Sequence, residues 1–200
     1  LQPLWELYYA TLLRKQFPKI SVKVEDLRDI KKVSIANTAD IFFFWLMKSA
    51  DANEVYEIAR DIKINNKESF IIIGGTHADH MADETLKYCD CVLQGTAEDT
   101  LFKVIKQFSE ENEKTSGILS KSNNNKFNDF DFPERDFIEK EKIVNKLHFQ
   151  KYGGVVGTGA YFSRGCSFSC KFCVYNNPPA FEYNSFEKIT AEIEYLKTNY

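Results

Sequence analysis

The chain has 200 residues with 44% hydrophobic content, so it can bury a core large enough for one or two domains. Its 26 basic and 29 acidic side chains are interspersed and leave a net charge of −3, which argues against a nucleic-acid partner. The longest apolar run, 41–47, is far shorter than the ~20 residues that a membrane span needs.

The cysteine count and the chain ends give expectations about the setting. Five cysteines is an odd number, which argues against a complete disulfide framework, and no signal peptide is visible. We therefore expect a reduced, cytoplasmic setting. Because the chain begins at Leu1 and its last residues, 186–200, have a helical pattern, we also expect a piece of a longer protein, cut at both ends.

Helical and strand patterns alternate over residues 1–110. The spacing of Leu4, Leu7 and Leu12 predicts a helix that must end before Pro18. Strands are expected at 21–24, 40–47, 69–75 and 91–93, and helices at 51–64 and 101–108, the first of these opened by a capping box at 51–54. The run 40–47 lacks polar alternation, which is typical of a strand covered on both faces.

This alternation indicates the α/β class, with parallel β-α-β units in a doubly wound, Rossmann-like sheet over residues 1–110. Ligands of such sheets lie beyond the carboxyl ends of the strands. Those ends here carry the segments 74–77 and 94–98. The candidate contacts are Gly74, Gly75, His77, Gly95 and Glu98. For the glycine pair, a strand-to-loop turn that needs a positive φ is an equally good interpretation, and His77 is equally consistent with a surface loop residue.

The composition changes after residue 110. Residues 111–150 are polar and turn-rich and are interpreted as a linker, within which 117–119 is expected to be one strand of a small hairpin. The stretch 127–138, with Pro133, is expected to be an extended connector that docks aromatic side chains on a surface. A second domain over 151–200 is expected to contain a strand at 155–163, a cysteine loop and a helix opened by a capping box at 184–187.

Three cysteines, Cys166, Cys170 and Cys173, form the most informative motif of the chain. Their C-x3-C-x2-C spacing places three thiols in one short loop, enough to ligate three irons of a cubane cluster and leave the fourth open. Zinc prefers four protein ligands, often including histidine, and no histidine lies nearby. An open-iron cluster is therefore favoured over zinc and over unligated thiols. Cys89 and Cys91 lie in the other predicted domain and are interpreted as buried small hydrophobes.

The segment Ser163-Arg-Gly-Cys166-x3-Cys170-x-Phe-Cys173 resembles the signature of radical S-adenosylmethionine enzymes. The resemblance implies that the three cysteines hold a [4Fe–4S] cluster whose open iron is chelated by S-adenosylmethionine. It also implies that Phe172 packs near the adenine. The cysteine loop would then be the first βα turn of a TIM-like barrel, with a strand before it and a helix after it.

The preceding residues are similar to the cobalamin-binding domain that many of these enzymes carry. The similarity rests on the segments 74–77 and 90–101, and 132–136 resembles the connector that joins the two domains. It implies cobalamin contacts at the five candidate residues named above. The chain departs from the family at Gly95-Thr-Ala-Glu98, where Gly-Glu-Gly-Glu is frequent, and it lacks Asp-x-His-x-x-Gly. Phe44, Trp45 and Leu46 also stand where small residues would leave room for a nucleotide tail.

The resemblance implies an oxygen-sensitive enzyme that cleaves S-adenosylmethionine to a 5′-deoxyadenosyl radical and acts as a cobalamin-dependent methyltransferase or cyclase. The implied partners are a small-molecule substrate and an electron donor such as flavodoxin or ferredoxin. No turnover is expected from these 200 residues alone. The alternatives are a non-catalytic zinc module and a ligand-binding module with a degenerate cysteine loop. Arg164 is expected to neutralise the cluster or to cap the strand end, and Glu187, Glu192 and Glu194 to form a solvated helix face.

Overall fold

The computed structural model describes residues 3–27, 39–120, 125–144, 157–175 and 180–200. The chain forms two compact units, one of residues 29–124 and the other of residues 1–28 together with 125–200. The first helix thus belongs to the unit that contains the connector and the cysteine loop, whereas the sequence pattern groups residues 1–110 in one domain.

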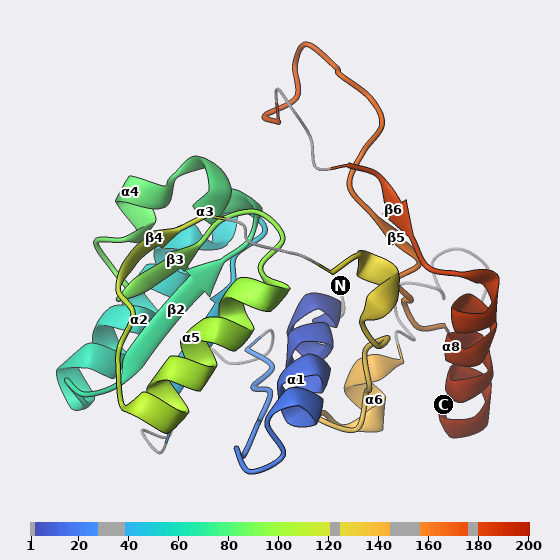
Figure 1. Ribbon diagram of the computed structural model, residues 1–200, viewed down its shortest axis with the longest axis horizontal. Helices are drawn as coiled ribbons and strands as arrows, with labels where there is room; N and C mark the ends of the chain where they lie inside the picture. The colour runs from blue at the N-terminus through green and yellow to red at the C-terminus, as the bar shows by residue number, and fades with distance from the viewer. Residues whose placement is uncertain (1–2, 28–38, 121–124, 145–156, 176–179) are drawn as a thin grey trace. The chain divides into compact units, whose positions relative to one another are not determined.

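Residues 29–124 form an α/β unit around a four-stranded parallel sheet, as the alternating pattern predicts (Figure 1). The strands are β1 (Ile41–Trp45), β2 (Phe70–Gly74), β3 (Cys91–Leu93) and β4 (Gly117–Leu119), in the order β1-β2-β3-β4. The helices between them are α2 (Ala52–Asn65), α3 (Thr76–His80), α4 (Ala82–Thr85) and α5 (Glu98–Glu111), and a 3-10 turn, η1 (Ser49–Asp51), precedes α2. The strand-order reversal that defines a doubly wound sheet does not occur among these four described strands.

The core of this unit lies on the two inner strands. Phe70–Ile73 of β2 and Cys91–Leu93 of β3 are completely buried, because β2 and β3 each have a neighbour on both sides. The expectation that 40–47 is covered on both faces is met in part, because no residue of β1 is exposed and none is completely buried. Strand β1 is half-buried, since it forms one edge of the described sheet.

Three further expectations for these segments are wrong. Residues 117–119 are no hairpin: they form β4, which pairs in parallel with β3 (Cys91↔Gly117), because the crossover helix α5 returns the chain to the same edge. Residues 21–24 alternate in exposure like a strand, but no described strand pairs with them. The capping box at 51–54 does not form either, because η1 already closes the turn before α2 and Asp51 makes no side-chain cap.

The other unit combines short elements with two long helices. It contains α1 (Leu4–Gln16), η2 (Phe127–Asp129), α6 (Lys140–Ile143), the antiparallel strands β5 (Ser163–Arg164) and β6 (Glu182–Tyr183), and α8 (Phe186–Asn199). In Figure 1 residues 165–175, which follow β5, extend away from α8.

The expected strand at 155–163 is largely absent. Residues 155–156 lie outside the described part of the chain. Within 157–163 only Gly157, in an isolated bridge, and Ser163, the first residue of β5, take part in β pairing. The helix after the loop is confirmed, but its cap lies one residue later than expected. The Ser185 side chain accepts the Lys188 amide at 3.4 Å, whereas Asn184 bonds back to the carbonyls of Tyr161 and Phe162.

Candidate functional site

The three-cysteine loop is carried by the short hairpin of β5 and β6. Ser163 pairs with Tyr183 and Arg164 with Glu182, and the Arg164 Nε donates to the Glu182 carboxylate at 2.6 Å. Gly165 follows with φ +79°, a conformation that favours glycine and turns the chain out of the hairpin toward Cys166. The ion pair explains Arg164 as a residue that closes the base of the loop.

The cysteine side chains face solvent on this loop. Cys166 and Cys170 are exposed and Cys173 is half-exposed, and all three are free thiols. The Phe168 amide donates to Cys166 Sγ at 3.4 Å, and the Cys173 amide donates to the Cys170 carbonyl at 3.0 Å. Within the described residues no three His, Cys, Asp or Glu side chains gather as metal ligands, so the thiols lie on one loop without converging on a point. Their number and accessibility nevertheless fit the donor set of an iron–sulfur cluster.

Apolar side chains are exposed around the thiols. Phe172, the residue before Cys173, is 93% exposed, and Phe168 is 72% exposed. Burying a phenyl ring is worth roughly 1.5–3 kcal/mol relative to leaving it in water. Two such rings on one loop therefore favour a partner surface or ligand against the loop.

His77 is held inside the α/β unit. Its Nε2 lies 2.9 Å from the Tyr56 hydroxyl and its Nδ1 2.9 Å from the Ser49 hydroxyl, so both ring nitrogens are engaged (6% of the residue is exposed). The Tyr56 hydroxyl also bonds to Thr85 at 3.0 Å, and burial raises the Tyr56 pKa. This environment is that of a satisfied core histidine rather than of a surface loop residue.

The glycine pair at the end of β2 is required by close backbone packing. Gly75 has φ +103°, and a Cβ there would lie 2.6 Å from the carbonyl oxygen of Leu46. A Cβ on Gly74 would lie 2.7 Å from the ring of Trp45. The Leu46 amide donates to the Gly74 carbonyl at 2.7 Å, and the Leu46 carbonyl accepts the His77 amide at 3.0 Å. The two glycines thus allow the end of β1 and the start of α3 to meet.

Gly95 and Glu98 follow the carboxyl end of β3, at the same end of the sheet as the glycine pair. The Gly95 amide donates to the Asp79 carboxylate at 2.6 Å, and the Gln94 side chain donates to the Asp79 carbonyl at 3.1 Å. Glu98 is completely buried at the start of α5. The structure therefore brings the five candidate cobalamin contacts to the carboxyl end of the sheet, as the topology predicts.

These five residues do not fit a cobalamin site. The chain's own groups occupy both nitrogens of His77 and the amide of Gly95, and Trp45 and Leu46 fill the space over Gly74 and Gly75. Glu98 presents no accessible surface to a ligand. Trp45 and Leu46, two of the three large residues at 44–46, close this end of the sheet.

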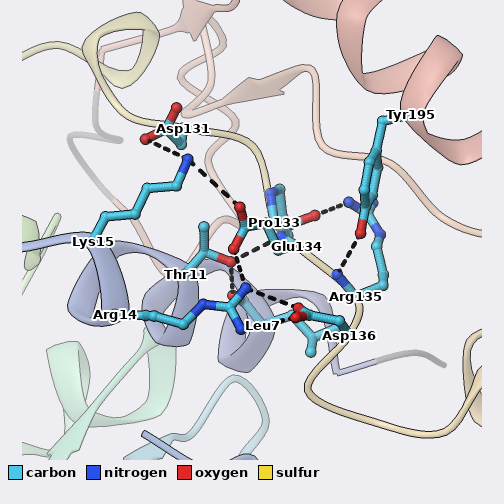
Figure 2. Close-up of polar contacts among 10 residues, drawn as sticks. All are labelled: Leu7, Thr11, Arg14, Lys15, Asp131, Pro133, Glu134, Arg135, Asp136 and Tyr195. Atoms are coloured by element: carbon cyan, nitrogen blue, oxygen red, sulfur yellow. Dashed lines mark hydrogen bonds and ion pairs between the residues drawn. The ribbon is translucent and has the colours of Figure 1, made fainter. Parts of the chain in front are cut away.

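The connector 132–136 is tied to α1 by a dense polar network (Figure 2). Arg14 pairs with Glu134 and, at 2.9 Å, with Asp136, and Lys15 pairs with Asp131 at 3.1 Å. The Arg14 guanidinium holds the Asp136 pKa below its usual value. The Thr11 hydroxyl accepts the Glu134 amide at 2.8 Å and donates to the Leu7 carbonyl at 2.7 Å.

Arg135 points the other way, toward the segments that flank the cysteine loop. Its guanidinium is completely buried and donates to the carbonyls of Pro133 and, at 3.0 Å, Gly159, and to the Glu192 carboxylate at 2.8 Å. Its amide donates to the Tyr195 hydroxyl at 3.1 Å. Glu192 is buried too, so its assignment to a solvated helix face is wrong. Burial raises the Glu192 pKa, and the hydrogen bond from Arg135 opposes that rise.

Sequence reasoning missed this ion pair because its partners are far apart in the chain. The connector motif at 132–136 predicts no role for the Arg135 side chain. Glu187, Glu192 and Glu194 read alike as surface positions of an amphipathic helix, and only the position of Glu192 among the apolar residues of α8 separates it from the others.

Comparison with known proteins gives distant relatives that are methyltransferases. The chain is 30% identical over 187 residues to an uncharacterized methyltransferase of Pyrococcus horikoshii, a match that covers 86% of this chain and 40% of that protein. It is 22% identical over 179 residues to the bacteriochlorophyllide d C-8(2)-methyltransferase of Chlorobaculum tepidum, covering 88% of this chain and 37% of that protein. The chain thus spans about two fifths of the length of these curated relatives. No protein-family model and no solved structure matches it.

The surroundings of Cys89 and Cys91 bear on the alternative of a zinc module. Cys91 is completely buried and Cys89 donates to the carbonyls of Thr85 and Cys91, and burial raises the pKa of both thiols to about 12. Cys91 exposes no surface to a metal ion, which disfavours a zinc site completed by this residue. None of the helices in the described part of the chain is both long and apolar enough to cross a membrane.

Proposed function

We propose that this chain contributes the cluster-binding loop of a radical S-adenosylmethionine methyltransferase. The observation that carries the proposal is the set of three free, solvent-facing thiols with C-x3-C-x2-C spacing on one loop, closed at its base by Arg164 and Glu182. Two distant relatives that are methyltransferases support methyl transfer over ring cyclisation.

Five residues of the loop have a proposed role. Cys166, Cys170 and Cys173 ligate three irons of a [4Fe–4S] cluster, and Phe172 packs on the adenine of S-adenosylmethionine. When bound, the cluster supplies the electron that cleaves S-adenosylmethionine to methionine and a 5′-deoxyadenosyl radical. The Phe168 amide, which already donates to Cys166 Sγ, offers a hydrogen bond of the kind that tunes the reduction potential of a ligating sulfur.

The partners follow from this chemistry. The reaction needs a small-molecule substrate that loses a hydrogen atom to the 5′-deoxyadenosyl radical and a second S-adenosylmethionine that gives its methyl group and leaves as S-adenosylhomocysteine. It also needs two electrons from a one-electron donor such as flavodoxin or ferredoxin. In this proposal residues 151–200 are the start of the barrel, and the sheet of residues 29–124 is a domain of the cobalamin-binding type by architecture. Cobalamin itself is left out of the proposed reaction because the candidate contacts do not fit it.

The test is reductive cleavage of S-adenosylmethionine by the anaerobically reconstituted full-length protein. We expect 5′-deoxyadenosine to form with dithionite, and we expect Cys170→Ala to form none. Cys89→Ala is the matched control, because this cysteine lies outside the loop, and it should keep the activity. Wild-type protein that carries a cluster and forms no 5′-deoxyadenosine would favour the alternative of a binding module.

A further inference from the structure

The two segments that flank the cysteine loop are tied together at successive levels. Nearest the loop, Arg164 pairs with Glu182 across the hairpin. Farther from the loop, the backbone amide of Asn184 donates to the Phe162 carbonyl at 2.9 Å, and its side-chain Nδ2 donates to the Tyr161 carbonyl at 3.2 Å. These contacts lie within the strands and the turn that precede α8.

The third level is made by Arg135, which comes from outside the segment. One terminal nitrogen of its guanidinium, Nη2, donates both to the Gly159 carbonyl, before the loop, and to the Glu192 carboxylate of α8, after it. A single buried cation thus joins the two sides of the segment that carries the three cysteines. The planar guanidinium can hold two acceptors in a fixed direction, which a lysine ammonium cannot do as rigidly.

Stability alone is a poor explanation for this ion pair. Arg135 Nε is buried and has no hydrogen-bond partner among the described residues, so the cation is not fully satisfied. Buried ion pairs of this kind are frequently no more stabilising than apolar residues of similar volume, because both charges lose their water. What the pair does supply is a defined distance between Gly159 and α8.

We propose that Arg135 is a positioning residue for the three-cysteine loop. By holding the Gly159 carbonyl against Glu192, it sets the separation of the two segments from which the hairpin extends, and so the placement of Cys166–Cys173. The Glu134 amide beside it donates to the Thr11 hydroxyl of α1, so the backbone that carries Arg135 is itself anchored. The part of this inference that concerns the cluster rests on the proposed function.

The experiment compares a double variant, Arg135→Met with Glu192→Leu, with the wild-type full-length protein. The double variant removes both charges together, so it avoids leaving one buried ion unpaired. It also removes the bond of Arg135 to Gly159 and the hydrogen bond of the Tyr161 amide to Glu192, so the single variant Arg135→Lys isolates the part played by Arg135. Arg14→Met is the matched control, because it breaks an ion pair on the same connector without touching Gly159 or Glu192.

The first readout needs no cluster. Hydrogen exchange is measured in the apo protein at the backbone amide of Asn184, which donates to the Phe162 carbonyl. We expect this amide to exchange about tenfold faster in the double variant, because the hairpin base opens more often, and at the wild-type rate in Arg14→Met. Unchanged exchange in a folded double variant overturns the positioning role.

The second readout is the cluster itself. After reconstitution, we expect iron release to a chelator to be at least about fivefold faster in the double variant than in wild type or Arg14→Met, because the loop no longer holds its ligands in place. Equal release rates overturn the inference as it concerns the cluster. Wild-type protein that takes up no iron and sulfide overturns the proposed function instead. The exchange result, which needs no cluster, then still tests whether Arg135 positions the loop.

A third variant covers the case in which the double variant does not fold. Arg135→Lys keeps the charge and loses the planar fork. We expect it to exchange Asn184 and release iron at rates between wild type and the double variant. Wild-type rates for Arg135→Lys on both readouts would show that the fork does not position the loop.

Discussion

The hydroxyl of Tyr56 lies 2.9 Å from Nε2 of His77 and 3.0 Å from the hydroxyl of Thr85. The three side chains join α2, α3 and α4 on the carboxyl side of the sheet. This relationship explains why a histidine that the sequence marks as a ligand candidate is instead part of the core.

Tyr56→Phe is expected to lower the free energy of unfolding by about 1–3 kcal/mol. The substitution keeps the ring but leaves buried polar atoms of His77 and Thr85 without this partner. Urea unfolding monitored by circular dichroism measures the change. Lys106→Ala, which removes only an exposed pair with Glu110, should change the stability by less than about 0.5 kcal/mol. Equal losses for the two variants would contradict the role of the Tyr56 hydroxyl.

Hydroxocobalamin is expected not to remain on the full-length protein after anaerobic incubation and desalting. The reason is that His77 and the Gly95 amide are engaged and that Trp45 and Leu46 cover the glycine pair. The absorption spectrum of the desalted protein is the measurement. A retained corrin spectrum in roughly stoichiometric amount would show that this edge opens for the cofactor.

Gly75→Ala is expected to destabilise the protein by about 3 kcal/mol or more, because a strained φ and a backbone clash add together. A useful comparison is Gly117→Ala. Gly117 has nearly the same φ, +98°, but its Cβ would have nothing within 4 Å. It should therefore lose only the conformational part, about 1–2 kcal/mol. If both variants lose the same free energy of unfolding, the close approach of Leu46 to Gly75 does not contribute to the cost of Gly75→Ala.

The Arg14–Asp136 ion pair predicts a dependence of stability on pH. Hydrogen bonding from Arg14 lowers the pKa of Asp136 in the folded protein, so the folded state binds fewer protons than the unfolded one in the window just below pH ~4. The stabilisation is therefore present above that pH and is lost as the pH falls through the folded pKa. Asp136 is largely exposed, so the effect is also expected to weaken in ~1 M salt.

Asp136→Asn tests this directly in unfolding titrations at several pH values. The difference in unfolding free energy between wild type and variant should be largest at neutral pH and should shrink toward zero in acid. A difference that stays constant across the acid range would mean that the carboxylate contributes through packing rather than through its charge.

The sequence predicts the parts of the fold that depend on local pattern. The β-branched run 69–75 becomes β2 and the amphipathic stretches become α2 and α5, because apolar periodicity alone determines which side chains are buried there. It also locates the three cysteines on one loop between an extended segment and a helix, since that prediction needs only their spacing and the helix signal after them.

The parts that depend on partners distant in the chain could not be predicted. The short segment 117–119 has too few residues to show a period, and its parallel pairing is set by α5 and β3. The burial of Glu192 depends on Arg135, which lies in another segment. The cap of α8 lies one residue later than the sequence predicts because Asn184 and Ser185 are both good capping residues, and only the hydrogen bonds of Asn184 to Tyr161 and Phe162 decide between them.

The most direct test of the central claim is the iron and acid-labile sulfide content of the anaerobically reconstituted full-length protein. A [4Fe–4S] cluster on Cys166, Cys170 and Cys173 predicts about four iron and four sulfide per chain, and visible absorption that is lost in Cys170→Ala. Stoichiometric zinc without sulfide would contradict the account and assign the loop to a structural metal site.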